Sequence, residues 1–246
     1  MPAPSLLNRL SEVKARFDQL RVAKESLLQL LDESEAHEAV LFSTTTEQPL
    51  DLDRLRSLHL MLIGNIDDEI AGRFRATGEY VRVGTHIAPA PEAVEGLLEA
   101  MLSKYSADVT GRPTQRLARL HLEFERIHPF VDGNGRIGRV MLNDALYRIG
   151  FAPIIIRNKG KLDYYSMLRR YDTDGTIKAF EDHLVVLMLE SLHRRTAYLA
   201  GLEIRPVVEV ARMQGEAPSA LLNKARRQSI PAFRERGVWK IGLASE

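Results

Sequence analysis

The sequence predicts a mainly helical protein: a helical bundle with one small β-hairpin, followed by a small C-terminal module of helices and strands. Three observations lead to this prediction. Apolar residues recur at spacings of three and four along most of the chain. The stretch 72–87 combines glycines with β-forming residues, as hairpins do. The segment 205–246 contains both helical periodicity and two short strand patterns around an Arg-Gly turn.

The composition limits the classes of protein that this chain can belong to. Its 246 residues are 45% hydrophobic with a net charge of +1, which suits one substantial domain plus a small one and excludes general disorder. It has no cysteine, which excludes disulfides, thiolate metal sites and thiol catalysis. No apolar run is long enough for a membrane span and no signal peptide is visible. We therefore expect a soluble, cytoplasmic protein without membrane contact, with export by an unrecognised route left open.

The N-terminal region, residues 1–50, is expected to be helical. From Ser5 to Leu31 the apolar residues follow a 3–4 alternation that only Lys24 interrupts. This face packs either against another helix of the same monomer or against a second copy in a homodimer. A second helix is expected from Ser34 to Phe42.

The middle of the chain predicts a series of helices. An aspartate, Asp51 or Asp53, can cap the first of them, and Pro91 suits the first turn of the next. The expected helices run to Ile63 from that cap, then over Pro91–Tyr105, Thr114–Ile127, Ile137–Ile149, Asp163–Tyr171 and Thr176–Leu199.

The segment His128–Arg139 (HPFVDGNGRIGR) concentrates residues that carry chemistry. Its glycines bring backbone amides close to a ligand, and a turn opening onto a helix N-terminus binds anions. Arg136 and Arg139 can reach the same anion. Asp132 offers the hard oxygen that Mg²⁺ prefers, and His128 can take a proton near neutral pH. The pattern predicts a nucleotide polyphosphate site with a general base.

This segment resembles, position for position, the motif H-x-F-x-[DE]-G-N-G-R-x-x-R of the Fic family. The resemblance covers about residues 51–199, so we expect a Fic domain over 51–200. It implies a protein adenylyltransferase that moves AMP from ATP, with Mg²⁺, to a Tyr, Thr or Ser hydroxyl of a target protein. It also implies that the run 151–157, a buried strand by periodicity, is an extended connection.

The resemblance assigns a role to each residue of the site. His128 would be the catalytic base, Asp132 the metal ligand, and Tyr164 the ring beside the adenosine, although an ordinary core tyrosine explains Tyr164 almost as well. Asp172 stands where relatives often carry Asn. The remaining nucleotide-binding residues would be Gly133, Asn134, Gly135, Arg136, Gly138 and Arg139.

The stretch 72–87 resembles the flap of Fic proteins, introduced by a G-x-[FY]-R segment at 72–75. The exposed flap backbone would hold a target segment by strand addition. Its residues nearest the nucleotide and the target would be Val83, Gly84, Thr85 and His86.

Many Fic proteins are restrained by a helix of pattern [ST]-x-x-x-E-[GN], whose glutamate pairs with the second motif arginine. Ser34 to Glu38 fits the first five positions, although Ala39 replaces Gly or Asn. The resemblance implies autoinhibition by Glu38 through Arg139. The alternatives are a solvated acidic helix and a separate antitoxin-like partner that supplies the inhibitory helix.

The tail, 205–246, has eight Lys or Arg and four Asp or Glu, a net charge of +4. Helices are expected over Pro206–Met213 and Pro218–Arg227, and strands over Ile230–Phe233 and Val238–Ile241. This arrangement resembles the winged helix-turn-helix of excisionase- and MerR-like domains, which implies DNA contact or a packing module of the same shape. The alternative function is thus a DNA-binding regulator or toxin–antitoxin component whose Fic site senses nucleotide or transfers another phosphate-containing group.

Overall fold

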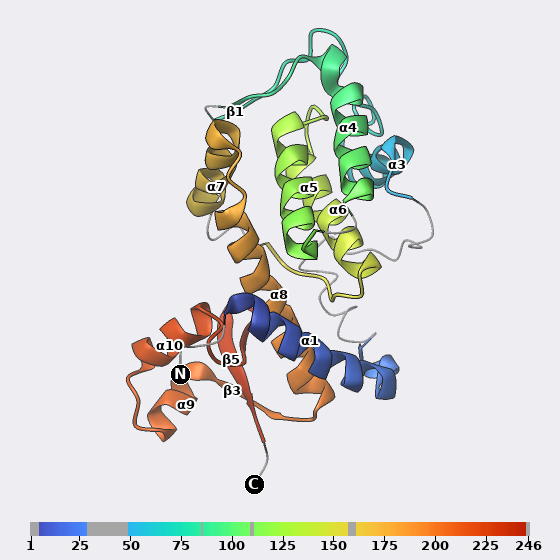
Figure 1. Cartoon of the computed structure of the whole chain (residues 1–246). Helices are drawn as coiled ribbons and strands as arrows, with labels where there is room; N and C mark the ends of the chain where they lie inside the picture. Colours follow the sequence, from blue (N-terminus) through green and yellow to red (C-terminus); the bar gives the residue numbers. More distant parts are fainter. Residues whose placement is uncertain (1–4, 29–48, 85, 109–110, 157–160, 245–246) are drawn as a thin grey trace. The chain divides into compact units, whose positions relative to one another are not determined.

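The computed structural model describes residues 5–28, 49–84, 86–108, 111–156 and 161–244. The chain divides into two compact units. Unit 1 comprises residues 1–39, 151–155 and 182–246, and unit 2 comprises residues 40–150 and 156–181. The predicted fold class, mainly helical with small sheets, is confirmed (Figure 1). No helix within the described ranges has the length and apolar character needed to cross a bilayer.

Unit 2 is a helical bundle built around α5 (Pro113–Ile127). This helix packs against α4, α6 and α7, and α3 packs against both α4 and α6. Figure 1 shows α4, α5 and α6 side by side. The other helices are α3 (Leu52–Ile63), α4 (Val94–Ala107, preceded by a 3₁₀ turn at Pro91–Ala93), α6 (Asn134–Arg148) and α7 (Lys161–Asp174).

The sequence of α5 explains its central place. Its apolar residues recur at Leu117, Leu120, Phe124 and Ile127, all of which are buried. Proline opens the helix at its first position, where the missing N–H costs nothing. The helix ends at Ile127 because His128 adopts left-handed backbone angles (φ 51°) and Pro129 follows. The chain therefore leaves the bundle core into the loop that carries the motif.

A small hairpin projects from unit 2. Strand β1 (Arg82–Val83) pairs with β2 (His86–Ile87) in antiparallel register, Arg82 opposite Ile87 and Val83 opposite His86. Each strand has only two residues, which leaves most of the backbone of the stretch 72–87 outside the ladder.

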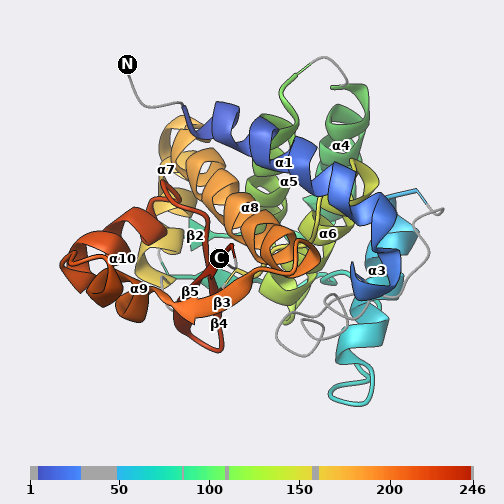
Figure 2. The same ribbon diagram turned by 90° about the horizontal axis from the view of Figure 1, so that it is seen from below.

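Unit 1 contains α1 (Leu6–Ala23), most of α8 (Lys178–Leu199) and a three-stranded antiparallel sheet. The strands β3 (Glu203–Pro206), β4 (Ala232–Glu235) and β5 (Val238–Leu243) lie in the order β3-β5-β4. Helices α9 (Val207–Met213) and α10 (Pro218–Arg226) pack on this sheet (Figure 2). The core between them consists of Val207, Val210, Ala211, Leu221, Ala225, Ala232 and Ile241.

Several predicted boundaries differ from the structure. Helix α1 is interrupted at Lys24, which leaves helical geometry and whose ammonium donates to the Leu199 carbonyl at 2.6 Å; residues 25–28 are helical again, and the predicted end at Leu31 lies outside the described residues. Helix α6 starts at Asn134 rather than Ile137. Strand β4 lies two residues later than predicted, and β3 was not predicted. The expected helix Ser34–Phe42 lies outside the described residues.

Candidate functional site

The first functional group is the imidazole of His128, the residue that caps the C-terminus of α5. Its Nδ1 lies 3.2 Å from the Glu125 carbonyl oxygen, which can only accept, so Nδ1 carries the proton and Nε2 keeps a lone pair. Burial lowers the pKa of His128 below its ordinary value. At neutral pH the ring is therefore an uncharged base whose Nε2 is available to take a proton.

The loop after His128 presents backbone amides to a ligand. Gly133 has φ 81°, a left-handed conformation, and is the N-cap of α6. The first helical hydrogen bonds come from the amides of Arg136 and Ile137 to the Gly133 carbonyl, so the amides of Asn134 and Gly135 precede the helical ladder. Together with the helix dipole, these amides can bind an anion, and residues 133–135 are called the anion-binding turn below.

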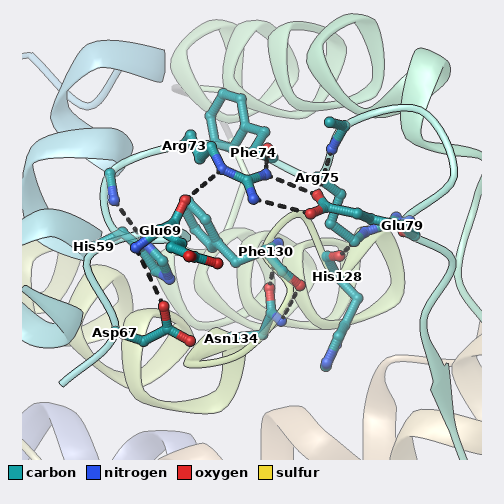
Figure 3. A network of polar contacts seen from close by, with 12 residues as sticks. His59, Asp67, Glu69, Arg73, Phe74, Arg75, Glu79, His128, Phe130 and Asn134 are labelled. Atoms are coloured by element: carbon teal, nitrogen blue, oxygen red, sulfur yellow. Dashed lines mark hydrogen bonds and ion pairs between the residues drawn. The ribbon is translucent and has the colours of Figure 1, made fainter.

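The side chain of Asn134 braces this loop from inside. It is 2% exposed, its Oδ1 accepts from the Phe130 amide at 2.9 Å, and its Nδ2 donates to the Phe130 carbonyl at 2.8 Å. Figure 3 shows the amide closing on the Phe130 backbone. The polar atoms that the sequence assigned to phosphates are thus already hydrogen-bonded within the loop.

A pocket of about 330 Å³ lies over the loop. Arg136 and Arg139 contribute two cations to its wall, and Asp132 an exposed carboxylate whose Oδ2 is 3.3 Å from the Arg136 guanidinium. Of the predicted residues, the structure gathers His128, Asp132, Gly133, Asn134, Gly135, Arg136, Arg139 and Tyr164 around this pocket.

Gly138, also predicted as a nucleotide-binding residue, has a packing role in the structure. A Cβ there would lie 2.4 Å from Glu125 Oε1 and 3.3 Å from both His121 and Phe124. Only a glycine lets α6 approach α5 this closely. The glycine thereby sets the distance between the helix that ends at His128 and the helix that starts at the anion-binding turn.

Glu125 is a buried carboxyl group beside the pocket. It is 8% exposed, its Oε1 has no hydrogen-bond partner, and burial raises its pKa to about 7 despite the nearby Arg139. A hydrogen bond from the neighbouring Tyr164 to this carboxyl group also lowers its pKa, but by less than burial raises it. The Tyr164 hydroxyl lies 2.7 Å from His121 Nε2, and burial raises the pKa of this tyrosine well above the ordinary value.

A second pocket, of about 360 Å³, adjoins the first between the hairpin and α7. Both pockets share Val83, Glu125, His128 and Tyr165, and Gly84 and His86 line the second. His86 holds the hairpin in place: its Nδ1 lies 2.6 Å from the Asp172 carboxylate and its Nε2 lies 2.8 Å from the Arg126 carbonyl. Three predicted hairpin residues thus line the same pocket as His128, while Thr85 lies outside the described residues.

Two arginines anchor the chain that leads to the hairpin (Figure 3). Arg75, only 4% exposed, donates to the carbonyls of His128 (2.8 Å), Pro89 (2.9 Å), Glu79 (3.0 Å) and Ile127 (3.3 Å). Arg73 forms a two-bond ion pair with Glu79, which lowers the pKa of that carboxyl to about 2. One buried guanidinium thus joins the hairpin base to the end of α5.

Sequence reasoning did not assign roles to His59, Arg75 or Glu125. The available signals were a histidine on the inner face of the helix 52–63, the arginine of the G-x-F-R segment, and an acidic residue on the apolar face of α5. The predicted inhibitory residues Ser34 and Glu38 lie outside the described residues.

The oxygen ligands at this loop suit a cation that is held jointly by the protein and by the phosphates of a substrate. Across the ranges that the structure describes, no group of three or more His, Asp or Glu side chains could hold a metal ion by itself. Asp132 offers one exposed carboxylate beside the anion-binding turn. Mg²⁺ is typically held by one or two carboxylates together with substrate phosphates, so these residues fit it.

Comparisons with known proteins find similarity in the part of the chain that contains this site. The sequence model of the Fic/DOC family matches residues 49–146. The chain is 34% identical over 166 residues to the protein adenylyltransferase Fic of Nematostella vectensis, a match covering 65% of this chain and 36% of that protein. The chain thus spans little more than a third of the length of this curated relative.

Solved structures share the fold. A Fic domain containing signaling protein from Bacteroides thetaiotaomicron superposes with a TM-score of 0.68 at 19% identity, covering 78% of this chain and 97% of that one. Fic-1 from C. elegans gives a TM-score of 0.55 at 26% identity, covering 69% of this chain and 49% of that one.

Proposed function

We propose that the chain is a protein adenylyltransferase of the Fic/DOC family, whose sequence model matches residues 49–146. It would transfer AMP from ATP to a Tyr, Thr or Ser hydroxyl of a target protein. The observation that carries the proposal is a neutral imidazole, His128, at the edge of a pocket that also holds an anion-binding turn and two arginines. The Nematostella vectensis relative bears the name of this activity.

The chemistry follows from the position of His128 between the two pockets. A target hydroxyl donates its proton to Nε2 while its oxygen attacks the α-phosphorus of ATP. The bond from the α-phosphorus to the bridging oxygen breaks, pyrophosphate leaves, and AMP remains on the hydroxyl oxygen. The proton held on His128 then passes to solvent. Before the transfer, the Nδ1–H bond to the Glu125 carbonyl keeps the neutral ring in the tautomer whose Nε2 can accept the proton.

Amides and guanidiniums of this chain would stabilise the negative charge of the phosphates. The amides of Asn134 and Gly135 at the start of α6, with the guanidiniums of Arg136 and Arg139, face the same pocket. Asp132 would hold Mg²⁺, which supplies neutralisation of phosphate charge when bound. These are positioning and electrostatic tasks, which catalyse phosphoryl-type transfer without a covalent enzyme intermediate.

The hairpin would bring the target to the site. Most of its backbone lies outside the short β1–β2 ladder, which suits strand addition by a target segment. The pocket lined by Val83, Gly84 and His86 meets the nucleotide pocket at His128. The hydroxyl and the nucleotide would therefore reach the same imidazole from two adjoining spaces.

The test is a labelling reaction with purified protein, Mg²⁺ and ATP carrying the label on either the α- or the γ-phosphate. We expect α-label, and no γ-label, on protein, and loss of that label in His128→Ala. Binding of ATP to His128→Ala, measured separately, should remain, because the anion-binding turn is intact. Transfer of γ-label would show a phosphotransferase instead. Equal α-labelling by His128→Ala would refute the assigned base.

Regulation by the segment before unit 2 remains a proposal. Glu38, with Ser34, would restrain the enzyme by pairing with Arg139, and Glu38→Gly should then raise self-labelling several-fold. Unchanged labelling in Glu38→Gly would instead favour a separate antitoxin-like partner.

As a second function we propose that residues 205–246 form a winged-helix module that binds DNA. The order β3-β5-β4, with α9 and α10 between β3 and β4, supports this reading. Arg226 and Arg227 near the end of α10, and Arg236 in the β4–β5 turn, are exposed cations suited to phosphates. Binding of a fluorescent DNA duplex should weaken steeply with salt and with Arg226→Ala/Arg227→Ala. If the DNA does not bind, or if its binding does not depend on salt, the winged-helix residues form a packing module and the proposed DNA-binding function is wrong.

A further inference from the structure

His59 on α3 joins two loops that are distant in sequence. Its side chain is fully buried (0% exposed). The Gly72 amide donates to Nδ1 at 2.9 Å, and Nε2 lies 3.0 Å from the carbonyl oxygen of Asp132. One ring therefore connects the segment that leads to the hairpin with the residue proposed as the metal ligand.

These contacts fix the protonation of the ring. A backbone N–H can only donate, so Nδ1 must accept and cannot carry a proton. A backbone carbonyl can only accept, so Nε2 must donate to Asp132. The ring is therefore the neutral Nε2–H tautomer, with each nitrogen used by a different loop.

Three residues of the loop 128–139 lie against this ring: Phe130, Asp132 and Gly133. The Phe130 ring stacks on it with centroids 3.8 Å apart and planes within 2° (Figure 3). The Asp132 carbonyl accepts its proton. A Cβ added at Gly133 would lie 3.3 Å from Nε2, so the loop backbone passes directly against the ring. His59 thus fixes the backbone on both sides of the Asp132 side chain.

We infer that His59 is a positioning residue for the nucleotide site: its Nε2–H bond sets the backbone from which the Asp132 carboxylate and the following amides meet the metal–phosphate group. This inference rests on the proposed function. The bond to Gly72 would orient the ring, and the bond to Asp132 would carry the effect on binding. Second-layer partners of metal ligands typically change affinity by about 10- to 100-fold when removed.

The test uses two variants that differ by one methylene. In His59→Gln the side-chain amide nitrogen can occupy the place of Nε2 and donate to Asp132. In His59→Asn the amide oxygen can occupy the place of Nδ1 and accept from Gly72, but no donor reaches Asp132. Both variants lose the stack on Phe130, so they control for each other's packing loss.

The measurements are the Kd for α,β-methylene-ATP with and without Mg²⁺, and the melting temperature of the nucleotide-free protein. With Mg²⁺ we expect His59→Gln to bind within about threefold of wild type and His59→Asn to bind about 10- to 100-fold more weakly. The melting temperatures of the two variants should be similar.

Each contrary outcome identifies what has failed. If His59→Asn binds as wild type, or if both variants lose affinity equally, the inference is overturned while the proposed function stands. If affinity merely follows the melting temperatures, His59 is only structural and the inference is again overturned. If wild type itself does not bind the nucleotide analogue with Mg²⁺, the proposed function fails and the inference fails with it.

Discussion

Replacing Glu125 with glutamine should stabilise the protein at high pH and leave it nearly unchanged at low pH. The carboxyl is buried, its Oε1 has no hydrogen-bond partner, and its pKa rises from 4.5 to about 7 on folding. Between these values the unfolded chain releases the proton and the folded protein keeps it. The folded state therefore loses stability, relative to the unfolded state, as the pH rises through this window.

The size of the effect follows from the shift. Each pKa unit corresponds to about 1.4 kcal/mol, so a rise from 4.5 to about 7 makes the ionised carboxylate cost about 3 kcal/mol of folding free energy above pH 7. Because glutamine does not ionise, Glu125→Gln avoids this cost. The advantage of the variant should grow from less than about 1 kcal/mol at pH 5 to about 3 kcal/mol at pH 8.

The assay is urea unfolding followed by far-UV circular dichroism at several pH values between 5 and 8, for wild type and Glu125→Gln. Glu99→Gln on α4 is the matched control, because Glu99 is exposed and the substitution removes the same charge. A difference between wild type and Glu125→Gln that stays constant over this pH range would refute the reasoning, since it would show that the carboxyl does not change its proton affinity on folding.

Three further predictions concern the packing of unit 2, the packing of unit 1 and the base of the hairpin. Gly138→Ala should destabilise unit 2 by about 1–3 kcal/mol, because the added methyl would lie 2.4 Å from a carboxyl oxygen of Glu125. The control Gly96→Ala places its methyl with no atom within 4 Å and should stabilise unit 2 by up to about 1 kcal/mol. Thermal unfolding of the two variants measures the difference. Gln228→Ala removes three buried side-chain hydrogen bonds and should lower the free energy of unfolding of unit 1 by about 3 kcal/mol. Unfolding is followed by the fluorescence of the single tryptophan, Trp239. A loss below about 0.5 kcal/mol would contradict this prediction. Arg75→Lys cannot reproduce a guanidinium that bonds four carbonyls, so the proposed AMP labelling should fall at least tenfold while ATP binding persists. Equal labelling would show that the hairpin base does not need this anchor.

The structure of the loop 128–139 could be predicted because the residues that determine it are close together in the sequence. A histidine, a carboxylate, glycines and arginines at fixed spacing within 128–139 specify a turn and a helix N-terminus without reference to the rest of the chain. The start of α6 was placed three residues late, because glycine disfavours helix and the bracing of Phe130 by Asn134 is not visible from propensity.

The supporting residues could not be predicted because their roles depend on tertiary contacts. His59 and Asp132 are 73 residues apart, and Arg75 lies 53 residues before His128, whose carbonyl it bonds. Strand β3 was missed because it has four residues and ends in Pro206; such a strand is tolerated at a sheet edge, and only its pairing with β5 reveals it.

The hydrogen bond from Arg9 on α1 to the Gln228 carbonyl has a consequence for synthesis of the chain. These residues are 219 positions apart, so at about 5–20 residues per second the ribosome makes Gln228 about 10–40 s after Arg9. During that interval all of unit 2 leaves the ribosome and can fold. Helix α1, with Leu10 and Phe17 on its apolar side, must wait without this partner. Helix α1 is thus made well before the residue that it bonds, and during that interval its apolar side is open to a nascent-chain chaperone.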